Sequence, residues 1–113
     1  MKEVQFGYAL SQKKELRSLI EKRMEQLEEV VASFAPDVSA EWDCGEGSDV
    51  HQVVTLRLTD WAGSVIAVFD PKELESPSHA REHFNMLWRN LLAVRSHKLL
   101  ERLTGTGSGV GGS

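Results

Sequence analysis

Three consecutive segments in the middle of the chain alternate apolar with polar residues, and this alternation restricts the fold more than any other feature. The segments cover residues 38–44, about 50–59, and 65–69. A period of two is typical of strands that bury one face. Residues 45–49 and 60–63 are rich in Gly and Asp, which favour turns. We therefore expect three consecutive strands in one sheet.

Helical periodicity flanks these three segments. Apolar residues recur at spacings of three and four over residues 16–31, and again over residues 84–94. Ser11 is suited to cap the first helix. This helix should end near Phe34, because Pro36 disfavours helical geometry in the residue before it. The second helix is expected to follow the fourth strand, which Asp70-Pro71 closes, and to continue to Leu103.

A short strand is expected before the first helix, because Val4, Phe6 and Tyr8 alternate with polar or small residues. The order is then β-α-β-β-β-α. This order predicts an α+β fold, in which a four-stranded sheet carries both helices on one face. Residues 1–103 fit one domain, because a chain of this length buries roughly two-thirds of its unfolded surface. Residues 104–113 are rich in Gly and Ser and are expected to form a flexible tail or part of a linker.

Composition indicates a folded cytoplasmic protein. Hydrophobic residues make up 41% and charged residues 27% of the chain, as in ordinary globular domains. The single cysteine, Cys44, has no partner for an internal disulfide, and the first residues lack an apolar stretch of signal-peptide length. Of the three tryptophans, Trp42 and Trp88 occupy core spacings. Trp61 lies in a turn and is expected to be exposed.

The charge of the chain is distributed unevenly. The formal net charge is −4, which argues against a simple nucleic-acid binder. Residues 35–77 contain nine acidic residues against Arg57 and Lys72, whereas residues 78–103 contain five Lys or Arg against two Glu. The local field of a surface decides what that surface attracts. The C-terminal part therefore remains a candidate for binding an anionic partner.

The last helix changes from apolar to basic along one stripe. At 100° per residue, Arg95, Lys98 and Arg102 continue the stripe of the apolar residues that precede them. Unpaired burial of these charges against the sheet would cost several kcal/mol. We therefore expect the helix to extend beyond the sheet and present the three side chains to solvent or a partner. The alternative is that they are favourable helix C-terminal cations, at about 0.3–1 kcal/mol each.

The string His79-x-x-Glu82-His83 matches a zinc-protease pattern, in which two imidazoles bind the metal and the glutamate is the general base. A short chain offers little room for a substrate cleft, and no third ligand is identifiable. We interpret these residues as the polar first turns of a helix after Pro77, with metal-dependent hydrolysis as a minor alternative. The acidic surroundings of Cys44 should raise its pKa, the opposite of what a reactive thiolate needs. We expect no catalytic centre, no metal and no cofactor.

Several strings resemble the hibernation-promoting factor family, ribosome-associated inhibitors also called sigma-54 modulation proteins. The likeness covers residues 3–103. The first helix of that family typically reads Leu-Arg, then a lysine five positions after the Arg, then Leu-Glu; here these are Leu16-Arg17, Lys22 and Leu27-Glu28. The last helix of the family often closes with Leu-x-Lys-His-Lys, and here it reads Val94-Arg95-Ser96-His97-Lys98. The chain departs from the family at residues 79–84 and at Leu92-Ala93, where the family usually has Arg-Gln.

This resemblance implies a double-stranded-RNA-binding-like fold that occupies the decoding channel of the small ribosomal subunit and represses translation in resting or stressed cells. With the basic end of the chain included, the expected rRNA-binding residues are Arg17, Lys22, Arg89, Arg95, His97, Lys98 and Arg102. The alternative is a protein of the same fold that does not bind RNA. Such a protein would act as an interaction or regulatory module through the acidic face of its sheet.

Overall fold

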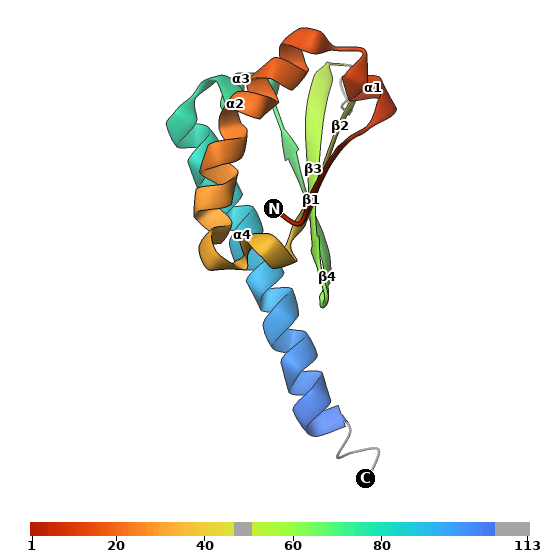
Figure 1. The fold of residues 1–113 in the computed structure, drawn as a ribbon, viewed down its shortest axis with the longest axis vertical. Helices are drawn as coiled ribbons and strands as arrows, with labels where there is room; N and C mark the ends of the chain where they lie inside the picture. Colours follow the sequence, from red (N-terminus) through yellow and green to blue (C-terminus); the bar gives the residue numbers. More distant parts are fainter. Residues whose placement is uncertain (47–50, 106–113) are drawn as a thin grey trace.

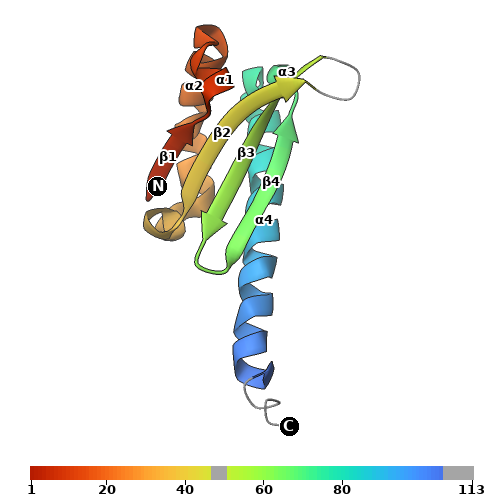
Figure 2. The same cartoon turned by 90° about the vertical axis from the view of Figure 1, so that its right-hand side faces the viewer.

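The computed structural model describes residues 1–46 and 51–105, which form a four-stranded sheet with its helices on one face (Figures 1 and 2). The strands are β1 (Glu3–Phe6), β2 (Ser39–Glu46), β3 (Gln52–Asp60) and β4 (Gly63–Phe69). The helices are α1 (Tyr8–Ser11), α2 (Lys14–Val31), α3 (Pro71–Glu75) and α4 (Pro77–Leu100), with a 3₁₀ turn η1 (Ala32–Asp37) and a π turn η2 (Glu101–Gly105). The predicted α+β class is confirmed. Part of the predicted turn at 45–49, the predicted strand start at Val50, and most of the predicted tail lie outside the described residues.

The sheet has the spatial order β1-β2-β3-β4. β1 runs parallel to β2, whereas β2, β3 and β4 form antiparallel pairs. A two-residue turn joins β3 to β4, and in it the Asp60 carboxylate accepts a hydrogen bond from the Ala62 N–H at 2.8 Å. Gly63 closes the turn at φ 153°, a backbone conformation that favours glycine, and an added Cβ would also lie 3.2 Å from Val94 of α4. The β3–β4 turn is therefore fixed closely against α4.

The core lies between the sheet and the two long helices, α2 and α4. The inward side chains of β2 and β3 alternate as the sequence predicts, and Trp42 is fully buried. Its ring lies 6.2 Å from both Phe69 and Phe84, measured between ring centroids. Trp88 is also buried, and it packs against Phe34. The prediction that Trp42 and Trp88 belong to the core is confirmed.

The chain leaves β1 earlier than the sequence predicts. Tyr8 was expected to end the strand, but it begins α1 and is 82% exposed. The short helix instead turns Leu10 into the core. Ser11 ends α1 and its hydroxyl donates to the Tyr8 carbonyl, so the prediction that Ser11 caps the long helix is wrong. α2 begins at Lys14, preceded by Lys13 without a side-chain cap.

The predicted last helix is divided in two, and each part has its own N-terminal cap. Asp70 and Glu73 form a reciprocal capping box at the start of α3. Ser76 adopts an extended conformation before Pro77, and its hydroxyl accepts from the N–H of His79 at the start of α4. Likewise, α2 ends at Val31 rather than near Phe34, because Ala32 has a positive φ of 51°.

α4 extends well beyond the end of the sheet, as the sequence predicts (Figures 1 and 2). It contains 24 residues, and at 1.5 Å per residue its length is about 36 Å. We call residues 95–103 the overhang. Its leucines, Leu99, Leu100 and Leu103, are exposed. Across the described residues, no helix is both long enough and apolar enough to cross a membrane.

Candidate nucleic-acid interface

The overhang carries four of the seven predicted rRNA-binding residues. His97 is three-quarters exposed, and its Nε2 lies 3.2 Å from a carboxylate oxygen of Glu101. The amino group of Lys98 lies 3.5 Å from the other oxygen of the same carboxylate. These are surface ion pairs, which typically contribute less than about 1 kcal/mol each. The side chains of His97 and Lys98 are therefore accessible to an anionic partner.

Arg95 is not presented to solvent, and the prediction that it is exposed with Lys98 and Arg102 is wrong. Its side chain is only 14% exposed, and its Nε lies 3.0 Å from Oδ2 of Asp60, whose side chain is fully buried. The contact is an ion pair without good hydrogen-bond alignment. The guanidinium also lies 4.5 Å from the centroid of the Phe34 ring. Arg95 thus joins α4 to the β3–β4 turn and to η1.

Trp61, in the β3–β4 turn, contacts two arginines, Arg95 of α4 and Arg102 of η2. The guanidinium of Arg102 lies 4.6 Å from the Trp61 ring centroid, and that of Arg95 lies 6.0 Å away. Trp61 remains 46% exposed, which confirms the prediction of an exposed tryptophan in this turn. Cation–π contacts of this kind contribute about 0.5–1 kcal/mol at exposed sites. The β3–β4 turn therefore orients the start and the end of the overhang.

Asp60, Trp61 and Phe34 are the residues that sequence reasoning missed as organisers of the basic end. The turn string Asp-Trp-Ala-Gly is visible in the sequence, but nothing in it indicates a partner 35 positions away. The contact arises only because β4 and α4 bring residue 95 back beside residue 60.

The other three predicted residues do not join this cluster. Arg17 lies over the Phe6 ring at 4.5 Å and forms an ion pair with Glu21 at 3.7 Å. Lys22 is exposed on α2, and Arg89 is exposed on α4. The first turns of α2 lie at the opposite end of the molecule from the overhang (Figure 1). The seven residues therefore do not form one continuous surface.

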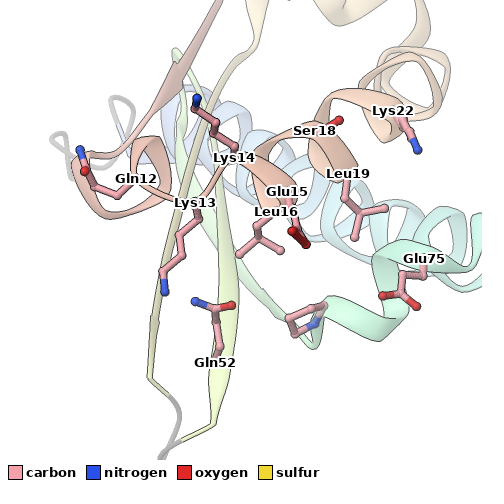
Figure 3. Close-up of a pocket in the computed structure, with 11 residues that line it drawn as sticks. Gln12, Lys13, Lys14, Glu15, Leu16, Ser18, Leu19, Lys22, Gln52 and Glu75 are labelled. Atoms are coloured by element: carbon pink, nitrogen blue, oxygen red, sulfur yellow. The ribbon is translucent and has the colours of Figure 1, made fainter.

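A groove at the start of α2 contains a second group of lysines. Its volume is about 760 Å³. Figure 3 shows Lys13 and Gln52 at one end of the groove and Lys22 and Glu75 at the other. Lys14 and Glu15 also line it, so cations and acids are nearly balanced. The groove is wide and only weakly basic, and it offers less positive potential than its three lysines suggest.

The residues of the zinc-protease pattern differ in their surroundings. His83 is turned toward α3, where its Nδ1 lies 3.2 Å from Glu73 and its ring packs on Phe69 at 4.1 Å. His79 and Glu82 are exposed on the surface of α4. Within residues 1–46 and 51–105, no three His, Cys, Asp or Glu side chains lie close enough to hold a metal ion.

The Cys44 thiol is expected to react slowly in the folded protein. Burial is the main cause that raises its pKa, the Asp43 carboxylate adds to the increase, and Lys13 opposes it. A raised pKa leaves less thiolate, which is the reactive species. Iodoacetamide labelling at about pH 8 should be slower in the native protein than in urea. Asp43→Asn should accelerate native labelling, and equal rates in both states would contradict the shift.

The open face of the sheet is acidic on one side and apolar on the other. Glu41 and Asp43 project from β2, Arg57 from β3, and Ile66 and Val68 from β4. A shallow hollow of about 250 Å³ lies among the charged residues and Ile66. The predicted acidic sheet face therefore corresponds to β2, and the β4 side of the same face is neutral.

The two surfaces that the sequence singles out are thus separate in the structure, with the overhang at one end and the open sheet face on the side away from the helices. Comparison of the chain with protein-family models, with curated proteins and with solved structures found no match. The nature of each surface is accordingly given by its charge, exposure and position in the fold.

Proposed function

We propose that this chain is a non-catalytic ribosome-binding protein that occupies the decoding channel of the small subunit and so represses translation. The proposal starts from the resemblance to the hibernation-promoting factor family. It is supported by the agreement between the expected element order and the observed sheet with two long helices on one face. The observation that carries it is the overhang, a helix end that projects beyond the sheet with His97 and Lys98 exposed.

The overhang suits binding to phosphates because it separates its cations from the acidic strands. Glu41 and Asp43 project from the open face of the sheet, whereas the overhang lies beyond the end of the sheet. Cations held away from carboxylates keep their positive potential, and each phosphate contact that they make releases counterions. Occupancy alone blocks the channel, so the mechanism requires no bond-making step.

The structure changes which residues the proposal assigns to rRNA. Arg95 is paired with Asp60, so its role is to hold the overhang in place. His97, Lys98 and Arg102 lie on the projecting part and are assigned to phosphate contacts. Arg89 is exposed on α4 but precedes the overhang, so it is not assigned to the same contact. Arg17 and Lys22 would require a second, separate contact.

Binding to small ribosomal subunits should depend steeply on salt. Wild-type protein is expected to co-sediment with the subunits at about 50 mM salt and to be largely released at about 200 mM. The double variant Lys98→Ala, Arg102→Ala removes two phosphate contacts. The variant should therefore bind more weakly, and its plot of log K against log salt should be less steep, with a slope smaller in magnitude by about two.

The matched control removes two exposed cations elsewhere, with Arg57→Ala on the open sheet face and Lys72→Ala on α3. This control has the same net charge as the test variant, so a general charge effect would weaken both equally. Equal weakening, or wild-type protein that stays in the supernatant at both salt concentrations, would contradict the assignment of the overhang to rRNA.

A second candidate function is a protein-interaction module without RNA binding. The observation that favours it is the pair of carboxylates on β2, Glu41 and Asp43, beside exposed apolar side chains on β4. Such a surface repels phosphates and suits a protein partner. This function predicts no binding to ribosomal subunits at either salt concentration.

A further inference from the structure

The two edges of the sheet differ in how well they are protected against pairing with another strand. β1 and β4 are the edge strands. β1 is only four residues long and contains Glu3, and a short, charged edge resists pairing. β4 is seven residues long, and Gly63–Phe69 contains neither a charged residue nor a proline. The β4 edge therefore lacks the usual sequence features that prevent edge-to-edge association.

β4 also carries apolar side chains that no other element covers. Ile66 and Val68 project from the open face and are 55% and 54% exposed. The side chains that alternate with them, Ala67 and Phe69, are buried toward α4. β4 pairs with β3 residue for residue from Val54↔Phe69 to Asp60↔Gly63, so no bulge twists the edge away. The strand is thus regular and has one side available for hydrogen bonding.

We propose that β4 is the interface for a second copy of this chain, joined antiparallel and edge to edge around a two-fold axis. The result is one continuous sheet of eight strands. If the axis passes beside Ala67, Ile66 of each copy lies opposite Val68 of the other. The four branched side chains then form one apolar cluster on the open face, with cross-strand pairs of the stabilising kind. The same segment meets itself, as a two-fold interface requires.

The charges at the two ends of β4 are complementary in this arrangement. Asp70, Glu73 and Glu75 lie at the end of β4 where α3 begins, and the overhang lies beyond the other end (Figure 2). Antiparallel pairing brings the acidic α3 end of one copy to the same end as the overhang of the other, which carries Lys98 and Arg102. Because β4 itself is uncharged, no like charges face one another across the new strand pair.

Sedimentation velocity of the purified full chain tests this interface directly. The wild-type protein is expected to pass from monomer to dimer as its concentration rises over roughly the micromolar to submillimolar range. Ile66→Lys, Val68→Lys places charges on the edge, as natural edge strands do, and should raise the dissociation constant at least about tenfold. Thr59→Lys is the control for an added lysine on this face, since Thr59 is exposed on the same face but belongs to β3, inside the sheet.

The interface is supported if the wild type and Thr59→Lys dimerise and the β4 variant stays monomeric. The β4 variant must also keep the circular dichroism and urea midpoint of the wild type. Wild-type protein that is monomeric throughout overturns it. A dimer that persists in the β4 variant also overturns it and would locate the contact elsewhere, for example on the exposed leucines of the overhang. The inference does not rest on ribosome binding, because sedimentation measures the mass of the free protein.

Discussion

Replacing Arg95 with alanine is expected to lower the free energy of unfolding by roughly 3–5 kcal/mol. The reason is the fully buried Asp60 carboxylate, which loses its ion pair at 3.0 Å and is left uncompensated away from water. The contact of the guanidinium with Phe34 is lost at the same time. Urea unfolding, followed by tryptophan fluorescence and circular dichroism, measures the change.

Lys98→Ala is the matched control for Arg95→Ala, because it removes a cation one turn further along the same helix face. Lys98 is exposed and forms a surface ion pair with Glu101, so its removal should change stability by about 0.5 kcal/mol or less. Adding Asp60→Asn to the Arg95→Ala variant should restore part of the loss, because it removes the unpaired charge. Equal, small effects of Arg95→Ala and Lys98→Ala would show that Asp60 is not buried.

This result also decides how ribosome-binding experiments with Arg95 variants are interpreted. Weaker co-sedimentation of an Arg95→Ala variant would be expected from displacement of the overhang or loss of folding, since the side chain is held by Asp60. Lys98 and Arg102 are better positions for a binding test. Their replacement leaves the Arg95–Asp60 ion pair in place.

Replacing Trp42 with alanine is expected to lower the free energy of unfolding by about 3–5 kcal/mol, the range for removal of a buried aromatic side chain. Trp42 is fully buried at the centre of the sheet and packs against Phe69 and Phe84. Its indole N–H also points to the sulfur of Met24, at 3.3 Å. Its removal leaves a cavity that strands and helices cannot fill without moving. The urea midpoint is the measurement.

Trp61→Ala provides the comparison, because it removes the same side chain from a half-exposed position. Its loss costs the contacts with Arg95 and Arg102, which together are expected to contribute about 1–2 kcal/mol at most. Trp42→Phe should fall between the two. A loss for Trp61→Ala as large as that for Trp42→Ala would mean that the β3–β4 turn, rather than the aromatic core, limits stability.

The proposed dimer and the proposed ribosome binding make different demands on the same helix end. In the dimer, the overhang of one copy lies toward the acidic α3 end of the other, whereas on the ribosome its cations contact phosphates. If both proposals hold, high salt should weaken both contacts, because each includes opposite charges at the surface. The β4 variant Ile66→Lys, Val68→Lys separates them, since it keeps every residue of the overhang.

The sequence alone determined the order of elements and most of the core, because both depend on local periodicity. Residues that alternate in β2 and β3 must place Trp42 and Leu56 on the same face once the strands pair. The helical stripe through Phe84 and Leu91 likewise fixes which side of α4 faces the sheet. The boundaries were less accurate. The sequence places Ser11 at the start of α2, but Ser11 ends a separate short helix, α1, whose Leu10 is buried in the core.

Only the tertiary structure decided which basic residues are available for binding. Arg95 and Lys98 are alike in the sequence, since both are cations on one stripe of the last helix. They differ in the structure because Asp60, 35 positions earlier than Arg95, places its buried carboxylate beside Arg95, whereas Lys98 pairs with the exposed Glu101. Charge pattern follows from sequence, but the pairing of charges depends on distances that exist only after the sheet and helix have packed together.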